Sequence, residues 1–313
     1  MSAGRSWLFL FLCNMMWALQ FTSVKLIQDQ VGFFFTVWGP MTLATVFLYP
    51  SVRRELRSKG RPWPHPKELL VFLLLAAAGV FPGQFLVTWG TRLSLASNAA
   101  MLTLALPICT AFMAYLFLSE RMTRIRWIAF ALALGGVLLC SGVDYGTLNF
   151  GTAYLFGNLL IFAGVNGSAF YNSYGKKVLK RFSPLEMLFY TYVAMFLIMT
   201  PLTLATESGI FARIPQFTAG TWVGLFLLTV FHNYLSMILF LKALDYLDAI
   251  QTALSNYLIA FFGVPISAIW LGERMTPLMI AGGALVLLST LLITVWEERK
   301  RRWERAPRVT SGC

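Results

Sequence analysis

Residues 119–123 of this chain read SERMT, and residues 272–276 read GERMT. Five residues that recur almost unchanged 153 positions later indicate an internal repeat. An offset of 152 also pairs Asn14 with Asn166. The sequence therefore predicts two similar halves joined in one chain.

The composition places both halves in a membrane. Of the 313 residues, 58% are apolar and only 12% are charged, and the mean hydropathy is +0.69. Apolar runs of about 20 residues, the length that crosses a hydrocarbon core of about 30 Å, recur along the chain. These values exclude a soluble enzyme, a nucleic-acid-binding protein and a disordered chain as descriptions of the whole. The net charge of +12 reports membrane orientation, because Lys and Arg cluster beside the apolar runs.

Uncharged runs predict an all-α integral membrane protein with ten transmembrane helices. The candidate spans are residues 6–27, 33–50, 68–91, 95–118, 125–143, 153–175, 185–205, 219–243, 249–271 and 277–296. The longest polar insert, residues 51–67, ends in three alternating prolines and is predicted to be a surface loop. If the N-terminus is cytoplasmic and each span crosses once, 21 of the 25 Lys and Arg lie on the cytoplasmic side.

Five spans per half is an odd number, so the second half must enter the membrane from the opposite side. This is the 5+5 inverted-topology repeat that builds many secondary transporters. The predicted units are residues 1–143 and 153–296, followed by a basic cytoplasmic tail at 297–313.

Several features together resemble the EamA-type transporters of the drug/metabolite transporter superfamily, over about residues 6–296. They are a polar and aromatic first helix in each half, a proline within span four, and a glutamate closing spans four and nine: Asn14, Trp17 and Lys25; Asn166, Phe170 and Lys177; Pro107; Glu120 and Glu273. One departure is that the second half has Ala260 at the position of Pro107 and its own proline at Pro265.

The resemblance implies a carrier with a central cavity lined by spans one, three, four, six, eight and nine. It implies a small-molecule substrate such as an amino acid, moved by efflux or exchange. The bilayer would be the inner membrane of a bacterium. The family resemblance predicts no enzymatic activity and no cofactor.

Polar side chains near the middle of a span are costly in hydrocarbon, so they mark where a transport site is expected. Together with neighbouring aromatic residues, the candidates for substrate binding are Asn14, Trp17, Gln84, Asn166, Phe170, His232, Asn233, Tyr234 and Asn256. Each amide alone is better explained by an interhelical hydrogen bond that joins two helices. As a set from five helices, they indicate a shared cavity lined by amides and aromatic rings, which suits a ligand with an apolar or planar body and a polar end.

His232 is the candidate for proton coupling, because it is the only group deep in a span that titrates near neutral pH. Transport is therefore coupled through His232 or not coupled to protons at all. Hinge candidates are Pro82, Gly83, Pro107 and Pro265, since proline frees a backbone carbonyl inside a helix.

Glu120 and Glu273 end their helices next to an arginine, and a carboxylate there opposes the helix dipole unless it is paired. We expect a salt bridge or a loop clamp at each.

Two other classes of protein remain open at this point. An intramembrane enzyme would have to use a pair formed by His232 with Ser168 or Ser236. A membrane scaffold or sensor that transports nothing is the other, and it predicts no ligand-dependent change at Asn14. No metal cluster is expected from two histidines in all. Substrate identity, direction and oligomeric state do not follow from these residues.

Overall fold

The computed structural model describes residues 3–60, 62–93, 102–140, 154–259, 261–262, 265–266 and 277–305. Within these ranges the chain forms helices and no strand. The α-helices are α1 (Ala3–Ile27), α2 (Phe33–Ser58), α3 (Pro66–Leu75), α4 (Val87–Leu93), α6 (Leu106–Leu118), α7 (Arg124–Cys140), α8 (Leu155–Leu179), α9 (Pro184–Glu207), α10 (Ile210–Arg213), α11 (Ala219–Phe226), α12 (Ser236–Tyr246), α13 (Ala249–Ser255) and α15 (Pro277–Arg305). Four further helical segments connect some of these, the π-helical η1 (Ala76–Val80), η2 (Pro82–Leu86) and η6 (Leu227–Leu235) and the 3₁₀-helical η5 (Ile214–Gln216).

Five helical stretches of the described chain are long and apolar enough to cross a bilayer. They are Phe33–Ser58, Pro66–Gly90, Pro184–Glu207, Ala219–Tyr246 and Ile280–Glu297. Large apolar side chains stand on the outer faces of several helices, among them Leu70 and Leu197, each 63% exposed, and Phe112, 60% exposed. Apolar surface on this scale belongs in contact with lipid tails.

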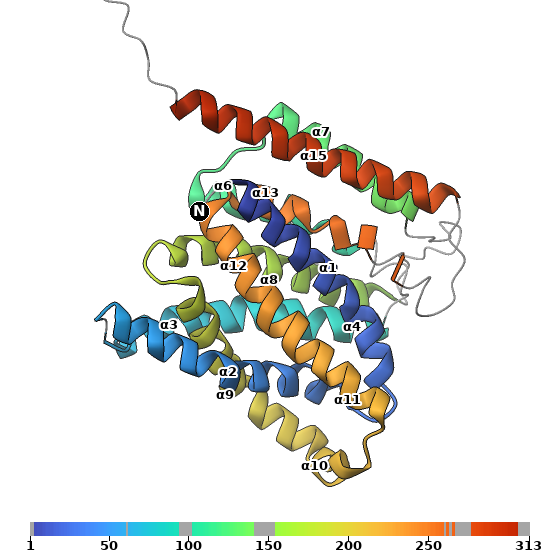
Figure 1. The fold of residues 1–313 in the computed structure, drawn as a ribbon. Helices are drawn as coiled ribbons and strands as arrows, with labels where there is room; N and C mark the ends of the chain where they lie inside the picture. The colour runs from blue at the N-terminus through green and yellow to red at the C-terminus, as the bar shows by residue number, and fades with distance from the viewer. Residues whose placement is uncertain are drawn as a thin grey trace, which may run out of the picture.

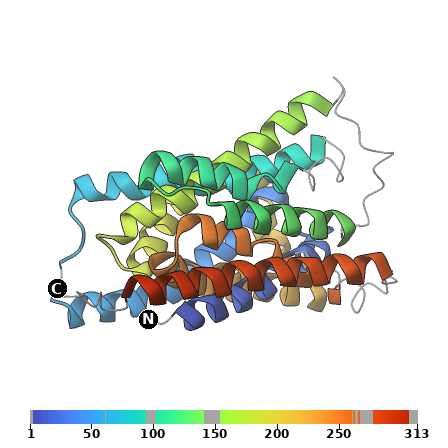
Figure 2. The same ribbon diagram turned by 90° about the horizontal axis from the view of Figure 1, so that it is seen from above.

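The helices of the first half pack against those of the second half, and most run lengthwise through the molecule (Figures 1 and 2). α1 lies along α11, η6 and α12, while α8 lies along η1, η2 and α4. α2 packs on α9, α6 on α13, and α7 on α15. α1 and α8 begin 152 residues apart, and α7 and α15 begin 153 residues apart.

α7 and α15 lie side by side along one side of the bundle (Figure 1). A Cβ atom at Gly136 would lie 2.7 Å from the carbonyl oxygen of Gly282, so the small residue lets the two backbones approach. The Ser289 hydroxyl donates to the Ala129 carbonyl at 2.6 Å. A close contact of small residues therefore holds this pair together.

The core of the bundle is built on α9. Its side chains Met187, Leu188, Tyr192, Met195 and Met199 are at most 1% exposed. The helix begins at a capping box in which Ser183 and Glu186 each satisfy a backbone N–H of the other. α9 is therefore a capped helix with one face packed in the core and the opposite face exposed.

Two helices run beyond the predicted span ends. α2 continues to Ser58, so the prediction of a loop from residue 51 was wrong over residues 51–58. The prolines that exclude helix begin only at Pro62, and the arginine-rich stretch before them is compatible with helix. α15 continues to Arg305, so the first residues assigned to a basic tail are helical.

Candidate transport site

Asn14 lies on α1 without exposed surface and joins α1 to α13. Its side-chain Nδ2 donates to the Leu10 carbonyl at 2.7 Å and to the Ser255 hydroxyl at 3.2 Å. Ser255 in turn donates to the Thr252 carbonyl at 2.7 Å. The Asn14 Oδ1 atom is buried and accepts no hydrogen bond from the described residues. Asn14 therefore joins two helices and keeps one buried acceptor atom, Oδ1, without a hydrogen bond from the described residues.

Trp17 and His232 form an aromatic wall between α1 and η6. The two ring centroids are 6.5 Å apart, and Trp17 also packs on Phe240 at 5.0 Å. Trp17 Nε1 and His232 Nδ1 are both buried, and neither has a hydrogen-bond partner among the described residues. Buried polar atoms without partners are rare and call for an explanation.

η6 owes its wide turns partly to Asn233. The side-chain Nδ2 of Asn233 donates to the Leu228 carbonyl, five residues earlier, at 2.8 Å. The Tyr192 hydroxyl on α9 donates to the Asn233 carbonyl at 3.0 Å. Tyr234 is half-buried with its ring 6.2 Å from Phe47. Of the three consecutive candidates, His232 alone is buried with a free polar atom.

The equivalent helix of the first half is also π-helical, in η1 and η2 on either side of Phe81. Pro82 lacks the N–H that would continue an α-helix. A Cβ at Gly83 would meet the Ser168 hydroxyl at 2.4 Å, so this glycine permits close packing on α8. Gln84 is half-buried in η2. Widened helices of this kind are frequent at functional sites.

Asn166 and Phe170 lie on α8 and are half-buried. The Asn166 side chain donates to the Phe162 carbonyl of its own helix at 2.9 Å. Phe170 stacks on Tyr174 at 5.2 Å and meets Phe117 edge-on at 5.7 Å. No hydrogen bond among the described residues joins Asn166 to Asn14, its equivalent in the repeat.

Two helices break close to the sequence-predicted site. Leu104 and Ala105 form a turn before α6, and Asn256 and Tyr257 form a turn after α13, 152 residues later. The Tyr257 hydroxyl donates to the Leu104 carbonyl at 3.0 Å, so one break is bonded to the other. Asn256 Oδ1 is buried and has no partner in the described part of the chain.

The hinge candidates have different surroundings. Pro107 lies in the first turn of α6, directly after the break and not in the middle of a helix, which is a position that proline tolerates. Pro265 lies in the short described stretch 265–266. The sequence-predicted Glu273 lies outside the described residues.

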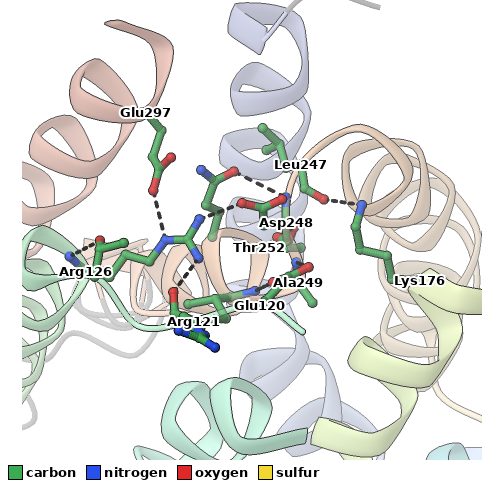
Figure 3. A network of polar contacts seen from close by, with 12 residues as sticks. Glu120, Arg121, Arg126, Lys176, Leu247, Asp248, Ala249, Thr252 and Glu297 are labelled. Carbon is green, nitrogen blue, oxygen red and sulfur yellow. Dashed lines mark hydrogen bonds and ion pairs between the residues drawn. The ribbon is translucent and has the colours of Figure 1, made fainter. Parts of the chain in front are cut away.

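A network of charged side chains closes one end of this region (Figure 3). The Glu120 carboxylate, two residues beyond α6, accepts the N–H of Ala249 at 3.1 Å and of Ile250 at 3.2 Å. These are the first two residues of α13, whose N-terminal N–H groups have no partner within the helix. Of the two alternatives expected for Glu120, the structure has the loop clamp.

Two cations hold the connection between α12 and α13 from other sides (Figure 3). Lys176 on α8 donates to the carbonyls of Leu244 at 2.7 Å and Leu247 at 2.6 Å. Arg126 on α7 is 5% exposed and pairs with Asp248 at 2.5 Å and with Glu297 of α15 at 2.8 Å. Three helices, α7, α8 and α15, are thereby attached to the connection between α12 and α13.

The environment of Glu120 perturbs its titration. Burial raises the pKa of the Glu120 carboxyl above its ordinary value of 4.5, and the charge of Asp248 raises it further. The two backbone N–H groups and the charge of Lys176 act in the opposite direction and do not cancel the shift.

A second carboxylate clamp lies at the opposite end of the bundle. Glu207, the last residue of α9, accepts the N–H of Phe34 and of Phe35, each at 2.9 Å, in the first turn of α2. A Cβ at Gly32 would lie 2.3–2.5 Å from this carboxylate, so only glycine leaves room for it. Beside it, the neutral Gln30 amide accepts from Thr218 N–H at 2.8 Å.

Sequence reasoning identified Asn14 and Asn233 but missed their partners, Ser255 and Tyr192. It also missed the contacts made by Tyr257, Asp248 and Glu207. These residues stand near helix ends or are ordinary hydroxyls, and polar residues there carry no signal of their own. Among the described residues, no group of three His, Cys, Asp or Glu could hold a metal ion.

An irregular set of apolar helices around buried polar atoms is the architecture of a membrane transporter. A model of the EamA-like transporter family matches the chain twice, over residues 5–142 and 155–295. The chain belongs to the EamA-like transporter family and is a multi-pass membrane protein. The family resemblance drawn from sequence is confirmed.

Relatives of similar length carry transporter names. A probable terminal-alkyne amino-acid exporter of Streptantibioticus cattleyicolor is 26% identical over 93% of this chain and 94% of its own. An S-adenosylmethionine uptake transporter of Rickettsia bellii is 23% identical over 90% of this chain and 88% of its own. An uncharacterized transporter of Archaeoglobus fulgidus is 25% identical over 92% and 98%. The family and these names indicate a transporter of small molecules and not an enzyme.

A solved crystal structure has the same fold. It superposes with a TM-score of 0.77 at 14% sequence identity, covering 96% of this chain and 99% of the other. At that identity the likeness concerns the fold alone.

Proposed function

We propose that the chain crosses the membrane ten times as a 5+5 inverted repeat, with both termini in the cytoplasm of a bacterium. Two separate family matches support the repeat, and so do the equivalent helix starts and the pairing of α1 with α12 and α8 with α4. The π-helical segments and the helix breaks recur at equivalent positions in the two halves. Interrupted helices at corresponding positions mark the binding site in transporters of this construction.

We propose further that the protein moves an amino acid or a closely related compound by alternating access. The observation that carries this proposal is the set of unpaired, buried polar atoms on α1 and on the π-helical η6 that packs against it. Trp17 Nε1 can only donate a hydrogen bond, and Asn14 Oδ1 can only accept one. A ligand that satisfies both needs an acceptor and a donor close together, as in an α-amino acid.

The relatives agree with this chemistry. The cargo named for the Streptantibioticus protein is an amino acid, and S-adenosylmethionine carries an α-amino-acid group as well. The aromatic rings of Trp17, Phe240 and His232 would receive the apolar body of the substrate. We assign the polar end of the substrate to Asn14 and Trp17.

A ligand screen by thermal shift tests the substrate class. The purified protein is heated with amino acids, nucleosides, cationic drugs and phosphorylated sugars in turn. A ligand present at 100 times its dissociation constant adds about 2.7 kcal/mol to stability. We expect amino acids to shift the unfolding temperature and the other classes to leave it unchanged.

Asn14→Leu then tests the site itself. Loss of one or two hydrogen bonds should weaken binding by about 1–3 kcal/mol, or some five- to hundredfold. Thr203→Val is a matched control, because Thr203 on α9 is also fully buried and also has no partner among the described residues. Equal losses in the two variants, or unfolding of Asn14→Leu in detergent, would move the site elsewhere.

We propose that transport is not coupled to protons, since the described midspan groups include no buried carboxylate and His232 is the one midspan histidine. An imposed pH step across reconstituted vesicles should then drive no accumulation of substrate. Accumulation that is lost in His232→Gln would assign coupling to His232 instead.

A further inference from the structure

α13 connects the charged end of the bundle to the proposed site. Its first residue, Ala249, donates to Glu120, and its last residue, Ser255, receives the hydrogen bond of Asn14. The helix has seven residues, so these two contacts lie about 9 Å apart along its axis at 1.5 Å per residue. After Ser255 the helix breaks at Asn256. One short helix, α13, therefore joins the Glu120 clamp to Asn14.

The Glu120 clamp holds α13 from a separate helix. Ser119 takes a left-handed conformation, with φ of 58°, which turns the chain at the end of α6 and brings Glu120 against α13. One helix break lies directly before α6 and the other lies directly after α13. The Tyr257 hydroxyl joins the two breaks by donating to the Leu104 carbonyl. The pair is thus fixed at the break by Tyr257 and at the charged end by Glu120.

The other charged groups at this corner have different tasks. Asp248 pairs with Arg126, Arg126 also pairs with Glu297, and Lys176 covers the carbonyls that end α12. None of these side chains accepts the Ala249 and Ile250 N–H groups, which both go to Glu120. Removing the Glu120 carboxylate therefore leaves the Ala249 and Ile250 N–H groups without their partner, while the Asp248–Gln251 capping box and the corner itself stay attached.

We propose that Glu120 is a positioning residue for transport, whose carboxylate holds the first turn of α13 and keeps the proposed site closed toward that end of the bundle. This inference rests on the proposed function. Without the two N–H contacts of Glu120, the first turn of this seven-residue helix frays, which loosens the contact of Ser255 with Asn14 and opens the site on one side of the membrane.

Sided labelling of a cysteine tests this without any substrate. Ser255 is 1% exposed, so Ser255→Cys reports opening. The four native cysteines are first replaced by alanine. A membrane-impermeant maleimide is then applied separately to each face of vesicles that hold the protein in one orientation, and the labelling rate is measured from each face.

Glu120→Gln keeps the size of the side chain but places an amide NH₂ group against a backbone N–H. Loss of this charge-assisted contact should accelerate labelling about tenfold from the Glu120 face and leave the opposite face unchanged. Glu207→Gln is the matched control, since it removes the same kind of clamp from the other end; it should not change labelling from the Glu120 face. Equal acceleration from both faces would mean general loosening, and unchanged rates would mean a static clamp; either result overturns the proposal.

Ala249→Pro is a second route to the same test. Ala249 is the first residue of α13, where proline is favoured, and Asp248 before it is already extended. The substitution deletes one of the two N–H groups and leaves Glu120 in place. It should also accelerate labelling from the Glu120 face alone, and an unchanged rate in a folded Ala249→Pro protein contradicts the proposal. Because labelling needs no ligand, failure to transport amino acids would count against the proposed function only.

Discussion

The two ends of the bundle use the same contact in opposite settings. At one end Glu120 accepts two successive N–H groups of α13, and at the other Glu207 accepts two successive N–H groups of α2. The charges of Asp248 and Lys176 act on Glu120, whereas Glu207 has the neutral Gln30 nearby; neither carboxylate forms an ion pair with the described residues. A carboxylate can therefore fasten a helix start with or without a network of charges.

This difference indicates which interactions stabilise each end. The Glu120 end depends on charged side chains from three helices and from the two helix ends at Glu120 and Asp248, so its stability should respond to charge removal and to pH. The Glu207 end depends on the space left by Gly32, so it should respond to steric change. Three substitutions or titrations separate these dependences, in order of decreasing effect.

Arg126→Met should cause the largest loss of stability. It leaves the carboxylates of Glu297 and Asp248 without their partner, and breaking a buried ion pair costs about 3–5 kcal/mol. Unfolding in detergent, followed by heat or denaturant, measures the loss. Lys59→Met is the control, because the Lys59–Glu55 pair lies at an exposed site and such pairs contribute about 0–1 kcal/mol. Similar losses in the two variants would mean that the network adds nothing beyond a surface pair.

Gly32→Ala should weaken the Glu207 end by an intermediate amount. The new methyl group would overlap the Glu207 carboxylate and displace it from the Phe34 and Phe35 N–H groups, at a cost of about 2 kcal/mol. Gly135→Ala serves as control, since a Cβ there meets nothing within 4 Å. The same unfolding experiment applies. A Gly32→Ala protein as stable as the wild type would show that the clamp is dispensable at this end.

A pH titration of stability should give the smallest effect, and only at the Glu120 end. Because the pKa of folded Glu120 is raised above 4.5, the folded protein binds more protons than the unfolded chain between the two pKa values. Stability should therefore fall as the pH rises from 4.5 through the folded pKa. Glu120→Gln should remove this part of the slope. A slope that stays the same in Glu120→Gln would assign it to other groups.

The sequence predicted the membrane class from its apolar composition and the family from its repeated motifs. It predicted the buried Asn14 and His232 because polar residues stand out within apolar runs. The structure buries both side chains. Their partners were not predictable in the same way. Ser255 is one of many hydroxyl residues, and its contact with Asn14 depends on how α13 packs across 241 residues of sequence.

The positions of the helix breaks were also not predictable from the sequence. Pro107 indicated an irregularity in span four, but the turn falls earlier, at Leu104 and Ala105, and no proline marks the equivalent turn at Asn256. Tertiary hydrogen bonds such as that of Tyr257 satisfy the backbone there. The residues that stabilise a break lie far away in sequence, so local pattern alone does not locate it.

Both carboxylate clamps are formed at once in this structure, and Asn14 and His232 are sealed between them. Many membranes maintain an electrical potential, and each elementary charge that crosses 100 mV dissipates about 2.3 kcal/mol. A carrier whose two ends opened together would act as a pore and discharge that potential. If each carboxylate closes its own end, as proposed for Glu120, release of one would leave the other as a barrier against ion leak.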